Sequence, residues 1–153
     1  MGNKLKSYDK ATENLMRQAM NLDVQTSGRF SLPEMVFLLR NAFKQSLTYR
    51  RVFSDDPIGL KRGDPSEGFC LVSSYYIYEH TGGDQVWRIM KSPLHWWLEH
   101  KQTGAVFDVT YTQFNEPFPY SVGTVEQRIE NDALFADVLR TKSAILGRYA
   151  GME

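Results

Sequence analysis

Residues 94–111 hold two segments of alternating character separated by a short polar turn, which is the pattern of an antiparallel β-hairpin. The first segment covers Leu94 to His100, the second covers Ala105 to Tyr111, and Lys101-Gln102-Thr103-Gly104 supplies the turn. Gln85 to Met90 predicts a further strand just before this hairpin. The chain is therefore expected to contain a small antiparallel sheet.

Alternation along the hairpin assigns its side chains to faces. His95 and Trp97 share one face of the first strand, and Asp108 and Thr110 share one face of the second. A two-residue turn makes His95 and Asp108 diagonal neighbours on the same face, roughly 7–8 Å apart before their side chains reach across. A four-residue turn places them directly opposite, whereas a three-residue turn separates them by face. Two of the three registers thus bring imidazole and carboxylate together.

Helical spacing of apolar residues predicts helices on both sides of this sheet. Capping-box patterns start two of them, Ser31-Leu32-Pro33-Glu34 and Thr124-Val125-Glu126-Gln127, where the first residue caps the helix and the fourth bonds back to it. Val36, Leu39, Phe43 and Leu47 are expected to form the buried face of the first. The predicted helices cover about 7–22, a stretch from 31 past 43, Gly68 to His80, and 124–147 with a break at Asn131-Asp132.

The length of 153 residues and the 42% of apolar residues suit one domain with a sizeable core. We predict a single α+β domain over 1–153, with helices packed on a small antiparallel sheet. Its parts are an N-terminal helical part at about 7–50, a core at about 66–114 and a C-terminal helix or helices at about 124–147. Ser54 to Ser66 is rich in Asp, Pro and Gly and is predicted to be a long loop, which is often functional.

Cys70 is the only cysteine, and it falls in the first turn of the helix predicted from Gly68. Unpaired backbone N–H groups and the positive end of the helix dipole lie there, and both favour a thiolate. A thiol, a base and an orienting carboxylate are the parts of a nucleophilic cysteine site, so Cys70, His95 and Asp108 form a candidate triad. The alternative is a buried, inert cysteine, which is a common occurrence.

The residues Gly68-Phe69-Cys70, His95-Trp96-Trp97, Gly104 and Asp108-Val109-Thr110 with Gln113-Phe114 resemble the YunG-like family of small bacterial proteins. That family looks like a compact branch of the papain-like fold, related to NlpC-type cell-wall peptidases. The resemblance covers residues 68–114, about a third of the chain, and not the N-terminal helices. It implies a papain-like fold with Cys70 as nucleophile, His95 as base and Asp108 as orienting group.

This sequence departs from the family pattern at two positions. Leu98 stands where the family tends to have Asn, and Val109 replaces Leu. If that Asn helps to shape the site, its loss leaves substrate handling open but does not affect the triad.

The expected function is a cysteine-dependent hydrolase or acyltransferase that acts on an amide, isopeptide or ester bond of a small-molecule or peptide substrate. The alternative is a non-catalytic binding or regulatory protein on the same fold. The backbone N–H of Cys70 would contribute to an oxyanion hole, with Gln113 and Gln45 as candidate second donors. Trp97 is a candidate for lining a substrate pocket, and Thr110 a candidate partner of Asp108.

Charge argues against a nucleic-acid-binding protein. Eighteen basic residues balance eighteen acidic ones, which leaves no global attraction for phosphates. A weaker alternative is a nucleic-acid-binding module that uses Arg50, Arg51, Lys61 and Arg62 together with the tyrosines. A cluster of solvated surface charges also accounts for these basic residues.

No metal, cofactor or membrane association is expected. The chain has no short-spaced pair of metal ligands, and His80 and His100 are expected to lie in solvent. The longest apolar run, Met35 to Leu39, is far short of a membrane span, and no apolar stretch follows the basic start. A soluble cytoplasmic protein is therefore the expectation.

Overall fold

Four strands pair into one antiparallel sheet, in the order β3-β2-β1-β4, within the residues that the computed structural model describes: 7–54, 68–114 and 118–152. The strands are β1 (Trp87–Ser92), β2 (His95–His100), β3 (Val106–Phe107) and β4 (Thr124–Val125). The helices are α1 (Ser7–Met20), α2 (Leu32–Phe43), α3 (Ser46–Val52), α4 (Cys70–His80), α5 (Arg128–Asn131) and α6 (Ala133–Tyr149). Together they make the α+β domain that the sequence predicts.

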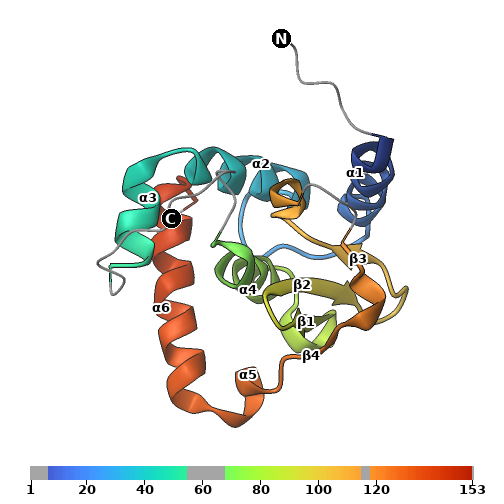
Figure 1. The fold of residues 1–153 in the computed structure, drawn as a ribbon. Coiled ribbons are helices and arrows are strands. Elements are labelled where there is room, and N and C mark those ends of the chain that lie inside the picture. The colour runs from blue at the N-terminus through green and yellow to red at the C-terminus, as the bar shows by residue number, and fades with distance from the viewer. Residues whose placement is uncertain (1–6, 55–67, 115–117, 153) are drawn as a thin grey trace.

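Helix α4 is the centre of the arrangement, with the sheet on one side of it and the long helix α6 on the other (Figure 1). Helices α2 and α3 cover one end of α6, and α1 packs beside β3. The approach of α6 to α4 is close, since a Cβ at Gly147 would lie 2.4 Å from the Tyr76 ring. The core between these layers includes Leu39, Ile77 and Leu98, all completely buried.

Helix α2 begins as its sequence predicts. The Ser31 side chain accepts the Glu34 N–H and the Glu34 side chain accepts the Ser31 N–H, so the capping box is confirmed. The buried face differs in part from the prediction: Leu39 and Phe43 are buried, but Leu47 belongs to α3 and is largely exposed. Helix α2 ends at Phe43 and the chain continues as the separate helix α3, so a single apolar face does not continue through the two helices.

The hairpin is confirmed, together with one of its predicted registers. Leu98 pairs with Phe107 and Glu99 with Val106, which is the register that a two-residue turn at Gln102-Thr103 implies. The predicted strand from Ala105 to Tyr111 is wrong in its second half, because β3 ends at Phe107. The Asp108 carboxylate accepts both the backbone N–H and the hydroxyl of Thr110, and this local bonding turns the chain into a short 3₁₀ helix.

The predicted capping box at Thr124–Gln127 is also wrong. Thr124 and Val125 form β4 and pair with Lys91 and Met90 of β1, and the Glu126 side chain bonds to Trp96 and Arg128. The predicted break at Asn131-Asp132 is confirmed: it separates α5 from α6. There the Asp132 side chain accepts the Phe135 N–H and caps α6.

The predicted long loop lies almost wholly outside the described residues, as do Lys61 and Arg62. Within the described ranges, no helix is both long enough and apolar enough to span a bilayer.

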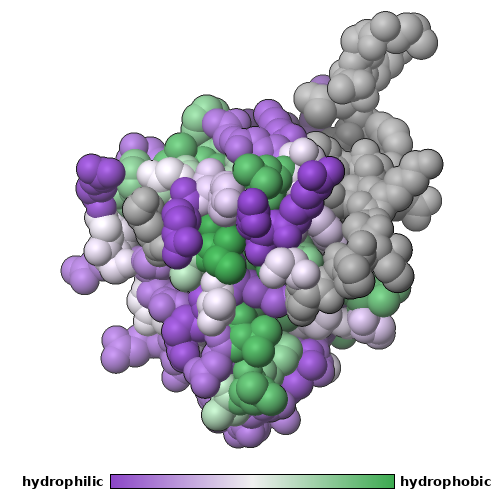
Figure 2. Space-filling view, turned by 90° about the vertical axis from the view of Figure 1, so that its left-hand side faces the viewer, coloured by the Kyte–Doolittle hydropathy of each residue, from purple (hydrophilic) through white to green (hydrophobic). Residues whose placement is uncertain are grey.

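Figure 2 looks onto the face that carries α3 and α6, where apolar groups gather in the lower part among polar ones. Leu134 and Val138 of α6 are exposed apolar residues, 75% and 45% accessible.

Candidate active site

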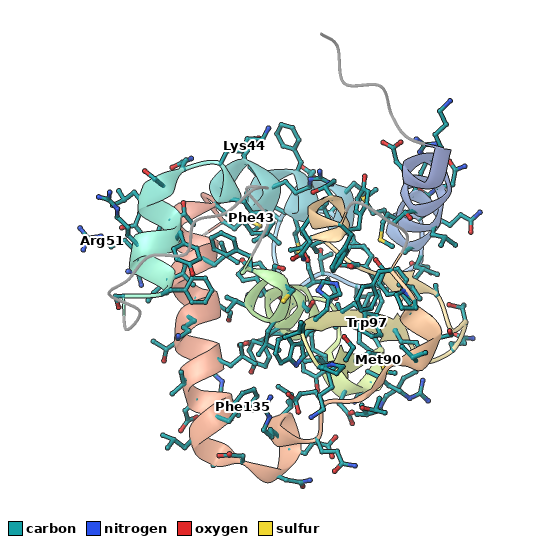
Figure 3. All side chains as sticks on the ribbon, in the orientation of Figure 1. Phe43, Lys44, Arg51, Met90, Trp97 and Phe135 are labelled. Atoms are coloured by element: carbon teal, nitrogen blue, oxygen red, sulfur yellow. The ribbon has the colours of Figure 1, made fainter. Side chains whose placement is uncertain are left out.

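The start of α4 is fixed by an aromatic cluster. Phe69, directly before the helix, is completely buried; its ring stacks on Phe43 at 4.5 Å and meets the Tyr49 and Phe53 rings at 5.7 and 5.5 Å (Figure 3 labels Phe43). Gly68 has a φ of 87°, a conformation that L side chains rarely adopt, and it lets the chain turn into the helix here. These contacts hold the next residue, Cys70, in place.

Cys70 lies in the first turn of α4, as predicted, and is its first residue, although the helix was predicted to begin near Gly68. The residue is 8% exposed. Its backbone N–H has no acceptor within the helix, because the first four N–H groups of any α-helix lie ahead of its hydrogen-bond ladder. This position also places the sulfur at the positive end of the helix dipole. The location therefore suits both a thiolate and the stabilisation of an adjacent oxyanion.

His95 and Asp108 meet as the hairpin register implies. His95 Nε2 lies 2.6 Å from Asp108 Oδ2, and each residue is only 1% exposed. His95 is the first residue of β2 and Asp108 follows β3 directly, so the paired strands bring the two side chains together. The sheet thus holds a histidine oriented by a carboxylate.

Asp108 is saturated with hydrogen-bond donors. Besides His95, Oδ2 accepts the Tyr120 hydroxyl at 2.7 Å, and Oδ1 accepts the backbone N–H and the hydroxyl of Thr110, each at 3.0 Å. The Gln113 amide in turn donates to Thr110 Oγ1 at 2.9 Å and to Thr110 O at 3.2 Å. Thr110 is therefore a partner of Asp108, as expected, and the Gln113 amide group stabilises this turn through Thr110.

Tyr120 is a site residue that the sequence reasoning missed. It begins the 3₁₀ helix Tyr120–Val122, directly after Pro119, and no spacing pattern in the sequence links it to Asp108. Burial and the negative charge of Asp108 raise the pKa of Tyr120, so its hydroxyl stays protonated and donates to the carboxylate.

Aromatic rings enclose the histidine. The His95 ring stacks on Trp97 at 5.7 Å and meets Phe114 and Phe118 edge-on at 4.6 and 4.8 Å. Trp97 is completely buried among these rings, so the expectation that it lines an open substrate pocket does not agree with its position (Figure 3). This enclosure keeps bulk water from one side of the His95–Asp108 pair.

The His95 ring has one nitrogen left for chemistry. Nε2 is bound to Asp108, whereas the buried Nδ1 makes no hydrogen bond of ordinary geometry to any described residue. Burial alone would lower the pKa of His95, but the bond to Asp108 and the neighbouring Cys70 thiol outweigh it and raise the pKa to about 9. Nδ1 is therefore the ring nitrogen that Asp108 does not engage.

An open pocket of about 270 Å³ lies beside Cys70. Its walls come from the end of α3, the start of α4, strand β2 and one face of α6. The lining includes Cys70, Leu71, Trp96, Phe135, Val138 and Lys142. Trp96, rather than its neighbour Trp97, is thus the tryptophan that a bound molecule could touch.

The remaining residues considered in the sequence, Gln45, His100 and His80, lie outside the His95–Asp108 pair and the pocket. Gln45 is exposed at the start of α3 and does not line the pocket beside Cys70. His100 is buried rather than solvated, because it packs edge-on against Trp87 and bonds to Thr103, so that prediction is wrong. His80 ends α4 and bonds to Ser27. Within the described part of the chain, no group of three His, Cys, Asp or Glu side chains is placed to hold a metal ion.

Comparisons with protein-family models, with curated proteins and with solved structures found no significant match to this chain.

Proposed function

We propose that this chain is a cysteine-dependent hydrolase or acyltransferase, with Cys70 as nucleophile, His95 as general base and acid, and Asp108 as the orienting group. The observation that carries the proposal is the 2.6 Å bond between His95 Nε2 and Asp108 Oδ2 beside a cysteine at a helix start. A thiol at a helix start, next to a histidine on a strand and an aspartate directly after a strand, also supports the papain-like resemblance. The single free cysteine fits a reducing compartment such as the cytoplasm.

The proposed reaction begins from an ion pair, in which His95 Nδ1 holds the proton that Cys70 has given up, and the thiolate attacks the carbonyl carbon of an amide, isopeptide or ester. The backbone N–H of Cys70 donates to the oxyanion that forms. The protonated His95 returns the proton to the departing amine or alcohol as the carbon–heteroatom bond breaks, which leaves a thioester on Cys70. Water or an amine, deprotonated by His95, then attacks the thioester and releases the thiol.

Asp108 supports both proton transfers. Its negative charge stabilises the imidazolium, and its bond to Nε2 leaves Nδ1 free to face the thiol. The raised pKa of His95, about 9, means that the ring is protonated at neutral pH and can accompany a thiolate as an ion pair. The substrate would be a small molecule or a peptide that reaches Cys70 through the adjacent pocket.

A non-catalytic binding protein on the same fold is the second candidate. It is favoured by one observation, that His95 Nδ1 makes no hydrogen bond of ordinary geometry to any residue that the structure describes. The reactivity of Cys70 separates the two candidates, because only an enzyme needs an activated thiol.

The test is the rate of Cys70 alkylation by iodoacetamide from pH 5 to 9, compared with the same chain unfolded in urea. We expect the folded protein to react at least tenfold faster than the unfolded chain at pH 6. His95→Gln should remove most of this advantage. His100→Gln changes another buried histidine of the same strand and should leave the rate within about twofold. A folded protein that reacts more slowly than the unfolded chain across this range would favour the binding protein.

A further inference from the structure

The pocket beside Cys70 has an apolar lining. Among its described lining residues, Cys70 and Lys142 carry the only ionisable side chains, and the others offer aromatic and aliphatic surface or backbone. The Lys142 ammonium lies 5.1 Å over the Phe53 ring, so its charge is directed at an aromatic face. None of the described lining residues is acidic, and most of them offer apolar surface, which suits a hydrocarbon.

Two walls of the pocket are tied together by one arginine. The Trp96 indole N–H donates to Glu126 Oε1 at 3.1 Å, and the Arg128 guanidinium bonds to both oxygens of the same carboxylate. That guanidinium also lies 4.1 Å over the Phe135 ring of α6. Arg128 therefore links Trp96 on the sheet side, through Glu126, to Phe135 on the helix side.

We propose that this pocket receives the acyl part of the substrate, and that the preferred substrates are derivatives of medium-length hydrophobic carboxylic acids. This specificity rests on the proposed function, because an acyl chain in the pocket presents its carbonyl carbon to the Cys70 sulfur at the pocket wall. Each methylene that leaves water for such a site improves kcat/KM about fourfold. A chain several methylenes longer than acetate should therefore react far faster.

The experiment measures kcat/KM for the p-nitrophenyl esters of acetic, butyric and octanoic acid. We expect octanoate to exceed acetate at least tenfold, with all turnover lost in Cys70→Ala. Val138→Glu places a charge in the pocket wall and should lower the octanoate value at least tenfold more than the acetate value. Leu134→Glu is the matched control: it lies one turn earlier on α6, is more exposed and does not line the pocket.

A second readout does not depend on turnover. The rate of Cys70 alkylation by N-octyl iodoacetamide is divided by the rate with iodoacetamide, and this ratio is compared with that of the urea-unfolded chain. A ratio raised at least fivefold in the folded protein and abolished in Val138→Glu supports the apolar pocket even if no ester is hydrolysed.

The two proposals fail in different ways. Ester hydrolysis that requires Cys70 but treats acetate and octanoate alike would overturn the acyl specificity and leave the enzyme intact. Loss of hydrolysis for every ester with a raised N-octyl ratio would overturn the enzyme and keep the apolar site. Equal effects of Val138→Glu and Leu134→Glu would also overturn the specificity.

Discussion

Asp108 shows how one buried carboxylate can serve both structure and proposed chemistry. One of its oxygens binds His95 and Tyr120, and the other ends strand β3 through Thr110. The negative charge is compensated by hydrogen-bond donors and by the protonated imidazole, which is the condition for keeping a charge in the interior. The same side chain thus sets the end of a strand and the orientation of the ring next to Cys70.

Replacing this charge should change the histidine more than the fold. In Asp108→Asn a neutral amide faces Nε2, so we expect the pKa of His95 to fall from about 9 toward the ordinary 6.5. Cys70 alkylation at pH 7 should then slow at least tenfold. The measurement is an NMR titration of the His95 ring together with the alkylation rate.

Tyr120→Phe is the control for this experiment. It removes one donor to Asp108 but leaves the charge, so the pKa of His95 should stay well above 6.5 while stability falls by about 1–3 kcal/mol. A His95 titration that is the same in Asp108→Asn and in the wild type would contradict the role given to the carboxylate.

At the scale of elements, the placement of the site depends on close packing between segments distant in sequence. The stretch before β4 passes so near to β2 that a Cβ at Gly123 would lie 2.2 Å from the Trp97 ring. Trp97 is completely buried and packs against Phe118 and Tyr120, so its ring has little room to move. Glycine is required here for space rather than for backbone conformation.

Gly123→Ala should therefore destabilise the fold by about 1–3 kcal/mol, because the Trp97 ring must shift against its neighbours. Gly28→Ala is the matched control: no atom lies within 4 Å of its added Cβ, so the change should be neutral or stabilising by up to about 1 kcal/mol. Both values come from urea unfolding followed by tryptophan fluorescence. Equal losses of stability in the two variants would show that the contact with Trp97 is not the cause.

Local patterns in the sequence were sufficient for elements whose partners lie nearby. The capping box of α2 and the 95–108 hairpin depend on bonds within a few residues or on one turn, although the sequence left the register of the hairpin open. The helix predicted to begin near Gly68 begins at Cys70. These local patterns failed where pairing with a strand distant in sequence determines the structure. Thr124 and Val125 satisfy a capping pattern, yet β1 recruits them into the sheet. Tyr120 likewise reaches Asp108 only through the tertiary fold.

For the molecule as a whole, two buried charges should set how stability depends on pH. The raised pKa of His95, about 9, means that its contribution is complete below 6.5 and is lost as pH rises through 9. Burial alone would raise the pKa of Glu126, but its bonds to Arg128 and Trp96 outweigh this and lower the pKa to about 2. Its contribution is complete above 4.5 and is lost as pH falls toward 2.

We therefore expect the free energy of unfolding to be highest between about pH 4.5 and 6.5 and to fall on both sides of this range. Urea unfolding at a series of pH values from 3 to 9.5 measures the profile. His95→Gln should reduce only the fall of the free energy of unfolding on the alkaline side, and Glu126→Gln only its fall on the acid side. An alkaline fall that persists unchanged in His95→Gln would show that other groups cause it.

The pocket wall supplied by α6 also has a consequence for the order of events during synthesis. Cys70 leaves the ribosome about 70 residues before Lys142, and at roughly 5–20 residues per second this interval lasts about 4–14 s. During that time His95 and Asp108 are made, but the helix that completes the apolar wall is not. A nascent chain therefore carries its thiol before it carries the surface proposed to select an acyl group, and the proposed selectivity would require that α6 has docked.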